Sequence, residues 1–228
     1  MQRVSPISAM KVPTDRALKP AVQAELSWSP DLDASGIEIH VEHSAVTASG
    51  VVGSYAELLA VGRAMTRVRG VTSAINKVMV QAENSRWVTD ADIRRIVDHA
   101  LTWSTTVPRT VRSRVLNRHV TLTGEVDWDF QRRAAHRAVQ DLRGVESVEN
   151  LIHLTTRTPV ENAEQQLRDA MERHPQLDAG RITATVIDHT AVLTGYVSSL
   201  AASEQAGSAT WGCPSVTQVD NRLVVRPS

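Results

Sequence analysis

The sequence has 228 residues, of which 25 are basic and 25 acidic, so its formal net charge is zero. A general nucleic-acid binder gathers a basic excess on one face, so we expect no nucleic-acid partner for this neutral chain. Apolar residues make up 42% of the chain but aromatic residues only 4%, which favours small two-layer units over one deep, pocket-bearing domain. The single cysteine, Cys213, excludes a disulfide within the chain.

No part of the sequence has the composition of a membrane-directing segment. Residues 1–12 include Arg3 and Lys11 but no apolar run of the kind found in a secretory signal, and we expect them to form a flexible tail. There is no run of 18 apolar residues, so no transmembrane segment is predicted. On these grounds the default expectation for the compartment is the cytoplasm.

The chain contains three copies of one unit. Residues 37–80, 111–154 and 182–225 align without a gap, at offsets of 74 and then 71 residues. Every copy keeps a glycine and, 26 residues later, an asparagine: Gly50 and Asn76, Gly124 and Asn150, Gly195 and Asn221. The same spacing found three times indicates one repeated structural unit. The units are predicted to span residues 1–84, 85–157 and 158–228, with linkers near 83–87 and 155–159.

Each unit is expected to open with a helix and a hairpin. Amphipathic helices are predicted at residues 14–26, 90–103 and 160–174. In the first copy Ile37, Ile39 and Val41 alternate with polar neighbours, which is typical of a half-buried strand. Two polar residues, Asn117 and Arg118 in the second copy, then separate this strand from a second alternating one, which predicts a tight antiparallel hairpin.

A second helix and a third strand are expected to complete each unit. In the second copy apolar residues recur at helical spacing from Ala134 to Leu142, and Gly144 is expected to end the helix. Closing strands are predicted at residues 73–80, 147–154 and 217–225. The glycine of the second strand falls on the inward face, where its missing side chain would let a helix approach. In the third copy Gly207 and Gly212 are each expected to cost the helix about 1 kcal/mol.

The sequence therefore predicts an α+β protein of three tandem αββαβ modules, each a three-stranded sheet with two helices on one face. These landmarks resemble the BON domain. The resemblance is carried by VTLTGEV at 120–126 and GVESVEN at 144–150, and in the third copy by AVLTGYV at 191–197 and PSVTQVDN at 214–221. It implies an OsmY-like protein with a role in osmotic or envelope stress. Some members of the family bind anionic phospholipid, and most lie in the periplasm or outer membrane, which is the alternative to the cytoplasm.

The middle unit is the basic one, with 12 basic and 9 acidic residues against 5 and 8 in the last unit. Four arginines lie on or beside its first strand: Arg109, Arg112, Arg114 and Arg118. By the strand alternation Arg112 and Arg114 point to the same side. They are candidates for contact with anionic lipid head groups, where each basic residue is worth about 1 kcal/mol. Contact with the acidic third unit or with another chain, or simple solvation, are the alternatives.

Three aromatic residues of the middle unit are candidate contact residues. Trp103 ends the leading helix, as Trp28 does in the first copy, and such a residue could lie in a membrane interface. We expect both instead to cap the module core. Trp128 and Phe130 form a pair just after the second strand, and the flanking Asp127 and Asp129 favour a protein contact there over insertion into anionic lipid.

No catalytic or metal-binding pattern is present. The eight histidines have no zinc or haem spacing, and there is no nucleophile elbow, phosphate loop or HExxH motif. We expect no metal, no cofactor and no enzymatic activity. The sequence therefore favours a binding protein that acts on anionic phospholipid or on protein partners. The alternatives are a self-assembling homo-oligomer whose modules join head-to-tail, and a cytoplasmic ion-responsive module. The repeated asparagines are expected to serve a turn or a backbone hydrogen bond.

Overall fold

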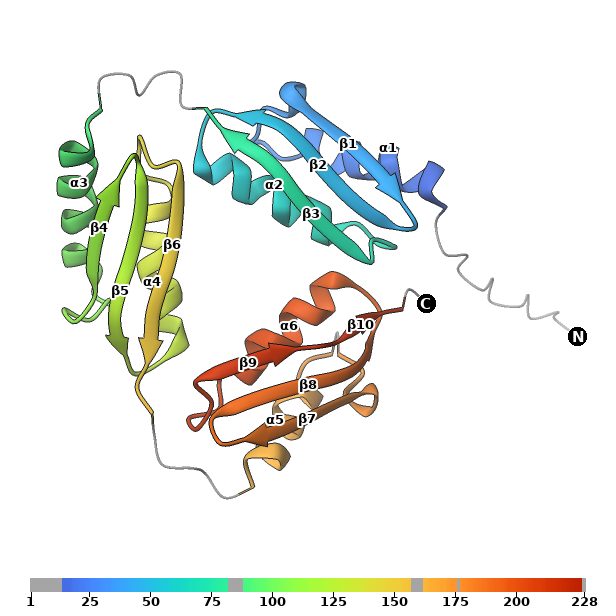
Figure 1. Ribbon diagram of the computed structural model, residues 1–228. Helices are drawn as coiled ribbons and strands as arrows, with labels where there is room; N and C mark the ends of the chain where they lie inside the picture. The colour runs from blue at the N-terminus through green and yellow to red at the C-terminus, as the bar shows by residue number, and fades with distance from the viewer. Residues whose placement is uncertain (1–13, 82–87, 157–161, 176, 227–228) are drawn as a thin grey trace, which may run out of the picture.

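The computed structural model describes residues 14–81, 88–156, 162–175 and 177–226 (Figure 1). The predicted tail at residues 1–12, the linker at 83–87 and residues 157–161 lie outside this part of the chain. Three modules follow one another, each with a leading helix, a hairpin, a second helix and a closing strand.

The elements of the three modules are as follows. Module 1 consists of α1 (Asp15–Ser27), the 3-10 turn η1 (Ala34–Gly36), β1 (Ile37–Glu42), β2 (Ala45–Val52), α2 (Tyr55–Arg67) and β3 (Ser73–Val80). Module 2 consists of α3 (Asp90–Trp103), β4 (Arg112–Leu116), β5 (His119–Val126), α4 (Asp129–Gln140) and β6 (Ser147–Leu154). Module 3 consists of α5 (Ala163–Glu172), η3 (Ala179–Arg181), β7 (Ile182–Ile187), β8 (Thr190–Val197), α6 (Leu200–Thr210), β9 (Gln218–Asn221) and β10 (Val224–Val225).

The predicted αββαβ fold is confirmed. In each module the first two strands pair antiparallel, and the closing strand pairs parallel with the second, so that the second strand is central. Module 3 differs from the expected three strands because its closing strand is split into β9 and β10. The break falls at Arg222 and Leu223, between Asn221 and Val224.

Each core forms between one face of the sheet and the two helices. In module 2 the inward residues Val120 and Leu122 of β5 are fully buried against Ile93 and Val97 of α3 and against Val139 of α4. The alternation of strand residues and the 3.6-residue helical period place these side chains on facing surfaces. No helix of the described ranges covers the opposite face of the sheets, and in Figure 1 the three sheets lie in front of their helices.

The role of the strand glycine differs from our expectation. Gly124 has φ +127°, and a Cβ atom there would lie 2.4 Å from the carbonyl oxygen of Thr110, just before β4. Gly50 and Gly195 have the same relation to the carbonyls of Gly36 and Arg181. The glycine therefore admits neighbouring backbone, not a helix.

Two expected helix features are also corrected. α4 ends at Gln140, ahead of Gly144, which lies in the following turn at φ +89°, where an added Cβ atom would crowd Val88 and Ile93 at 3.1–3.3 Å. α6 ends at Thr210, so only Gly207 lies within it and Gly212 follows it.

The three modules are arranged around a common centre, with β3, β6 and β9 on the inner side and β1, β4 and β7 on the outer side (Figure 1). One position of the repeat, the first residue of the second helix, recurs at the contacts between modules. Tyr55 of α2 is buried in the core of module 2, and Leu200 of α6 packs against the core of module 1. Asp129 of α4 occupies the same position of the repeat. One turn after it, Arg132 contacts Trp211 of module 3.

Candidate binding surface

In module 2, contacts fix both the first residue of the leading helix and the face that it turns to the sheet. Thr89 Oγ1 accepts from Asp92 N, and Asp92 Oδ2 accepts from Thr89 N, each at 3.2 Å, which is a reciprocal capping box. Ile93, Val97 and Leu101 bury one face of α3 on the sheet. The helix thus has a defined start and a defined inward face, and it ends at Trp103.

Asp90 joins this helix to the hairpin turn. Its two carboxylate oxygens accept from Asn117 N (2.7 Å) and Arg118 N (2.9 Å). Both turn residues have positive φ, as the two-residue turn of a type I′ hairpin requires. Asp15 binds the turn of module 1 in the same way. Because this contact fixes the start of α3 beside the β4–β5 turn, the end of α3 and the start of β4 meet at the opposite end of the module.

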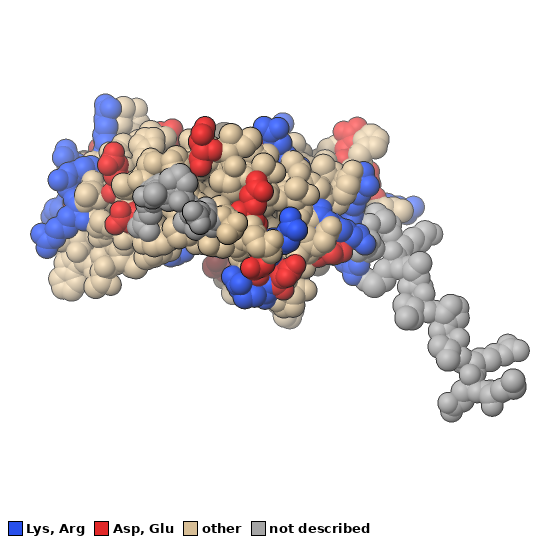
Figure 2. Space-filling model, turned by 90° about the horizontal axis from the view of Figure 1, so that it is seen from below, with Lys and Arg blue, Asp and Glu red and all other residues tan. Residues whose placement is uncertain are grey.

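At that opposite end lie Arg109 and Arg112, and Arg114 follows in the middle of β4, on the same face as Arg112. Arg109, Arg112 and Arg114 are all exposed, and Arg112 Nη1 donates to the carbonyl of Arg109 (2.9 Å). Arg109 and Arg112 help to line a shallow hollow between α3 and β4 whose other lining residues are uncharged. Figure 2, which views the molecule from below, shows basic residues gathered at its left end, where module 2 lies. We call Trp103, Arg109, Arg112 and Arg114 the α3–β4 corner.

Arg118 does not join this group. It lies in the β4–β5 turn at the other end of the strand, with its side chain 24% exposed and 3.4 Å from Glu146 Oε1. Its position is that of a turn residue, whose backbone N–H is bound by Asp90. Of the four candidates, Arg112 and Arg114 therefore share one face of β4, Arg109 contacts Arg112 just before the strand, and Arg118 lies at the far end.

The expected role of the two helix-end tryptophans is wrong. Trp28 is 86% exposed and Trp103 is 75% exposed, so neither caps a core. The ring of Trp103 lies beside that of His99 of the same helix, with ring centroids 5.2 Å apart. At the start of α4, Trp128 is half-buried and Phe130 is 47% exposed. Trp103 is therefore the more accessible aromatic residue at this end of module 2.

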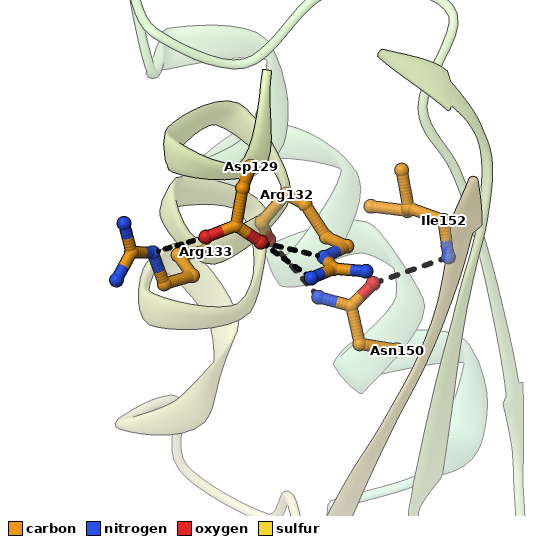
Figure 3. A network of polar contacts seen from close by, with 5 residues as sticks. All are labelled: Asp129, Arg132, Arg133, Asn150 and Ile152. Carbon is orange, nitrogen blue, oxygen red and sulfur yellow. Dashed lines mark hydrogen bonds and ion pairs between the residues drawn. The ribbon is translucent and has the colours of Figure 1, made fainter. Parts of the chain in front are cut away.

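Sequence reasoning missed a polar network at the contact between modules 2 and 3 (Figure 3). Asp129 is 2% exposed, and Arg132 Nε donates to its Oδ1 at 3.0 Å while Arg133 Nε lies 2.8 Å from its Oδ2. The Arg132 guanidinium also lies over the ring of Trp211 in module 3, 4.4 Å from its centroid. Two arginines of the basic module are thus used for internal contacts.

A second missed pair joins modules 1 and 2. The Tyr55 hydroxyl lies 3.3 Å from His136 Nε2 and donates to the carbonyl of Val148 (3.4 Å). Burial lowers the pKa of His136, its contact with Gln140 opposes this, and the charges of Arg137 and Asp141 act in opposite directions. Burial also raises the pKa of Tyr55. The available sequence signal for these contacts was one position of the repeat that holds three unlike residues: Tyr55, Asp129 and Leu200.

The repeated asparagines have the structural role that was expected. In each module the side-chain amide donates to a carbonyl of the second helix, and the side-chain oxygen accepts the backbone N–H two residues later. The donor distances are 2.9 Å from Asn76 to Leu58, 3.0 Å from Asn150 to Arg132 and 3.0 Å from Asn221 to Ser203. This contact ties the closing strand to the second helix.

Across the described ranges, no helix combines the length and the apolar character that a membrane crossing requires. A comparison with curated proteins finds no match. Among solved structures, the C-terminal domain of CdsD, the structural protein of the type III secretion system of Chlamydia trachomatis, is 13% identical, with a TM-score of 0.26 over 92% of this chain and 98% of that one. A second CdsD structure is 12% identical, with a TM-score of 0.23 over 92% of each chain. Similarity at this level carries no argument about function.

The family model of the BON domain matches three times, at residues 14–82, 89–156 and 159–227. The three matches together cover most of the sequence, and each includes one αββαβ module. The chain belongs to the BON domain family, with three such domains in tandem.

Proposed function

We propose that this protein is a non-catalytic binding protein that attaches to anionic phospholipid surfaces through the α3–β4 corner. BON domains are associated with envelope stress and phospholipid binding, and the family is generally non-catalytic. The observation that carries the proposal is that Arg109, Arg112 and Arg114 are all exposed along or just before β4, with the exposed Trp103 at the end of the helix that leads to this strand.

The chemistry of this corner suits a lipid head-group region. Each arginine near an anionic surface contributes about 1 kcal/mol, and the contribution decreases within a Debye length as salt rises. An exposed tryptophan has an apolar ring and a polar N–H, which is the combination enriched at membrane interfaces. The α3–β4 corner therefore combines charge attraction with a shallow apolar anchor.

Module 1 offers a natural contrast at the equivalent corner. Trp28 is exposed there as well, but Asp31 and Asp33 follow it, and Arg63 lies 3.7 Å from Asp31. An acidic corner is repelled by an anionic surface. The two tryptophans thus form a matched pair: aspartates follow Trp28 in the sequence, whereas arginines follow Trp103.

Co-sedimentation of the full chain with vesicles tests the proposal. We expect binding to phosphatidylglycerol-containing vesicles at low salt, loss of binding at high salt, and none to pure phosphatidylcholine. Arg112→Glu with Arg114→Glu should weaken binding about tenfold or more. Trp103→Ala should also weaken it.

Matched controls separate this corner from general charge. Trp28→Ala should leave vesicle binding unchanged, as should the charge reversal Arg16→Glu with Lys19→Glu on exposed positions of α1. Absence of the wild-type protein from the pellet at low salt, or equal losses in the controls, would refute the proposal.

A further inference from the structure

The uncovered faces of the sheets hold most of the exposed apolar residues of the described chain. Twelve large hydrophobic side chains are exposed, and the strand registers place eight of them on these faces. Five belong to modules 1 and 2: Val51, Ile75, Met79, Leu116 and Leu151. Exposed apolar residues gathered on one side of a molecule mark an interaction surface, whereas scattered ones need no explanation.

The first strands of modules 1 and 2 carry charges of opposite sign on their uncovered faces, and at one position the two are equivalent in the repeat. Glu38 on β1 and Arg112 on β4 occupy the same position of the repeat, as their 74-residue offset shows. The face of module 1 also carries Glu42, and the face of module 2 also carries Arg114. On the closing strands the signs are reversed, with an exposed lysine in module 1 and an exposed glutamate in module 2 (Lys77 and Glu149), and the central strand of module 2 adds the exposed Glu125.

Most of these charges are not neutralised within the described part of the chain, although Glu42 lies 3.9 Å from His43 Nδ1. Among the described residues, Glu38, Lys77, Arg114 and Glu149 have no ion-pair partner. Module 3 differs, because Asp220 and Arg222 on its closing segment pair with each other at 2.6 Å. The unpaired charges of modules 1 and 2 are thus complementary to each other but lie on separate modules of one chain.

We propose that two copies of this chain pair face to face, with the module 1 sheet of each copy on the module 2 sheet of the other. A twofold axis makes both contacts at once and closes the assembly as a dimer. The glutamates of β1 then meet the arginines of β4, and the apolar residues of both faces are covered, as in two packed sheets. The occupant of this surface is therefore a second copy of the chain.

This inference goes beyond the proposed lipid contact and can hold without it. The dimer covers Arg112 and Arg114, which belong to the α3–β4 corner, while Trp103 lies on the helix layer. Anionic vesicles should therefore compete with dimer formation. The dimer itself is measured without lipid, so that its failure leaves the vesicle experiment unaffected.

Light scattering of the full chain after size exclusion tests the proposal. We expect twice the single-chain mass at low salt, with dissociation at high salt or on dilution. Two variants reverse the charge of one face each: Glu38→Arg with Glu42→Arg, and Arg112→Glu with Arg114→Glu. Each should be monomeric alone, because like charges then meet at both contacts.

The mixture of these two variants provides the decisive measurement. In a mixed dimer the altered module 1 of one chain, now basic, meets the altered module 2 of the other, now acidic at positions 112 and 114. The unaltered module 2 of the first chain meets the unaltered module 1 of the second. Both contacts are thus complementary, and equimolar mixing should restore the dimer. A wild-type monomer at all concentrations, variants that stay dimeric, growth into larger assemblies, or no recovery on mixing would each overturn the proposal. Circular dichroism of each variant confirms that its fold is intact.

Discussion

Arg132 of module 2 lies over the ring of Trp211 in module 3, with its guanidinium carbon 4.4 Å from the ring centroid. The same guanidinium donates to Asp129, whose carboxylate is almost fully buried. The Asp129 carboxylate orients the guanidinium, and the face of the Trp211 indole attracts its positive charge. A single side chain therefore links the start of α4 to the neighbouring module.

A double-mutant cycle measures this link. Arg132→Ala and Trp211→Ala should each destabilise the protein, and the double variant should lose less than the sum of the two. We expect a coupling of about 0.5–2 kcal/mol from urea unfolding. Arg133 is the control, since it pairs with the same carboxylate but, among the described contacts, lies over no aromatic ring. Additive losses for Arg132 and Trp211, or an equal coupling for Arg133, would contradict this interpretation.

Replacing the strand glycine of module 2 should be costly. Gly124→Ala places a Cβ atom 2.4 Å from the Thr110 carbonyl oxygen at a φ of +127°, where L residues are strained. We expect a loss of about 2 kcal/mol or more in the free energy of unfolding, measured in urea.

Gly207→Ala in α6 is the matched control, with the opposite sign expected. Its Cβ atom would meet only Asn221 Nδ2 at an ordinary 3.6 Å, and its φ is not positive. Alanine is favoured over glycine within a helix by about 1 kcal/mol, so this variant should be more stable than the wild type. Stabilisation by Gly124→Ala, or a large loss from Gly207→Ala, would show that the two sites have been misassigned.

Local patterns were sufficient to predict the elements of each module. The alternation around Val120 and the helical spacing around Val139 depend only on neighbouring residues, and both fall as predicted. The role of Gly124 was not predictable in this way, because the carbonyl that excludes a side chain comes from Thr110, outside the strand. An inward glycine is compatible with either a helix or backbone beside it.

The surfaces were less predictable than the cores. Strand alternation correctly placed Arg112 and Arg114 on one outward face, but it could not show that Arg118 is held in the turn by Glu146. The burial of Tyr55 depends on how whole modules pack, which sequence spacing within one repeat does not specify. Trp103 was misjudged for the same reason, since an aromatic residue at a helix end is compatible with either burial or exposure.

The contact between modules 1 and 2 should weaken in mild acid. Burial beside Tyr55 lowers the pKa of His136 below its ordinary value of 6.5, so in the native state this group resists protonation. Above about pH 6.5 the His136 ring is neutral in both the folded and the unfolded chain, and its contribution to stability is complete. As the pH falls below that value the unfolded chain binds the proton first, so stability is lost. The loss ends once the pH has passed the pKa of His136 in the folded state. Urea unfolding between about pH 5 and pH 8 should show a steeper loss for the wild type than for His136→Gln, a comparison in which the other histidines cancel. Tyr55→Phe should keep the steep loss, because burial is the main cause of the shift and the ring remains in place. A wild-type curve parallel to that of His136→Gln would refute the prediction, and a shallow curve for Tyr55→Phe would assign the shift to the hydroxyl contact instead.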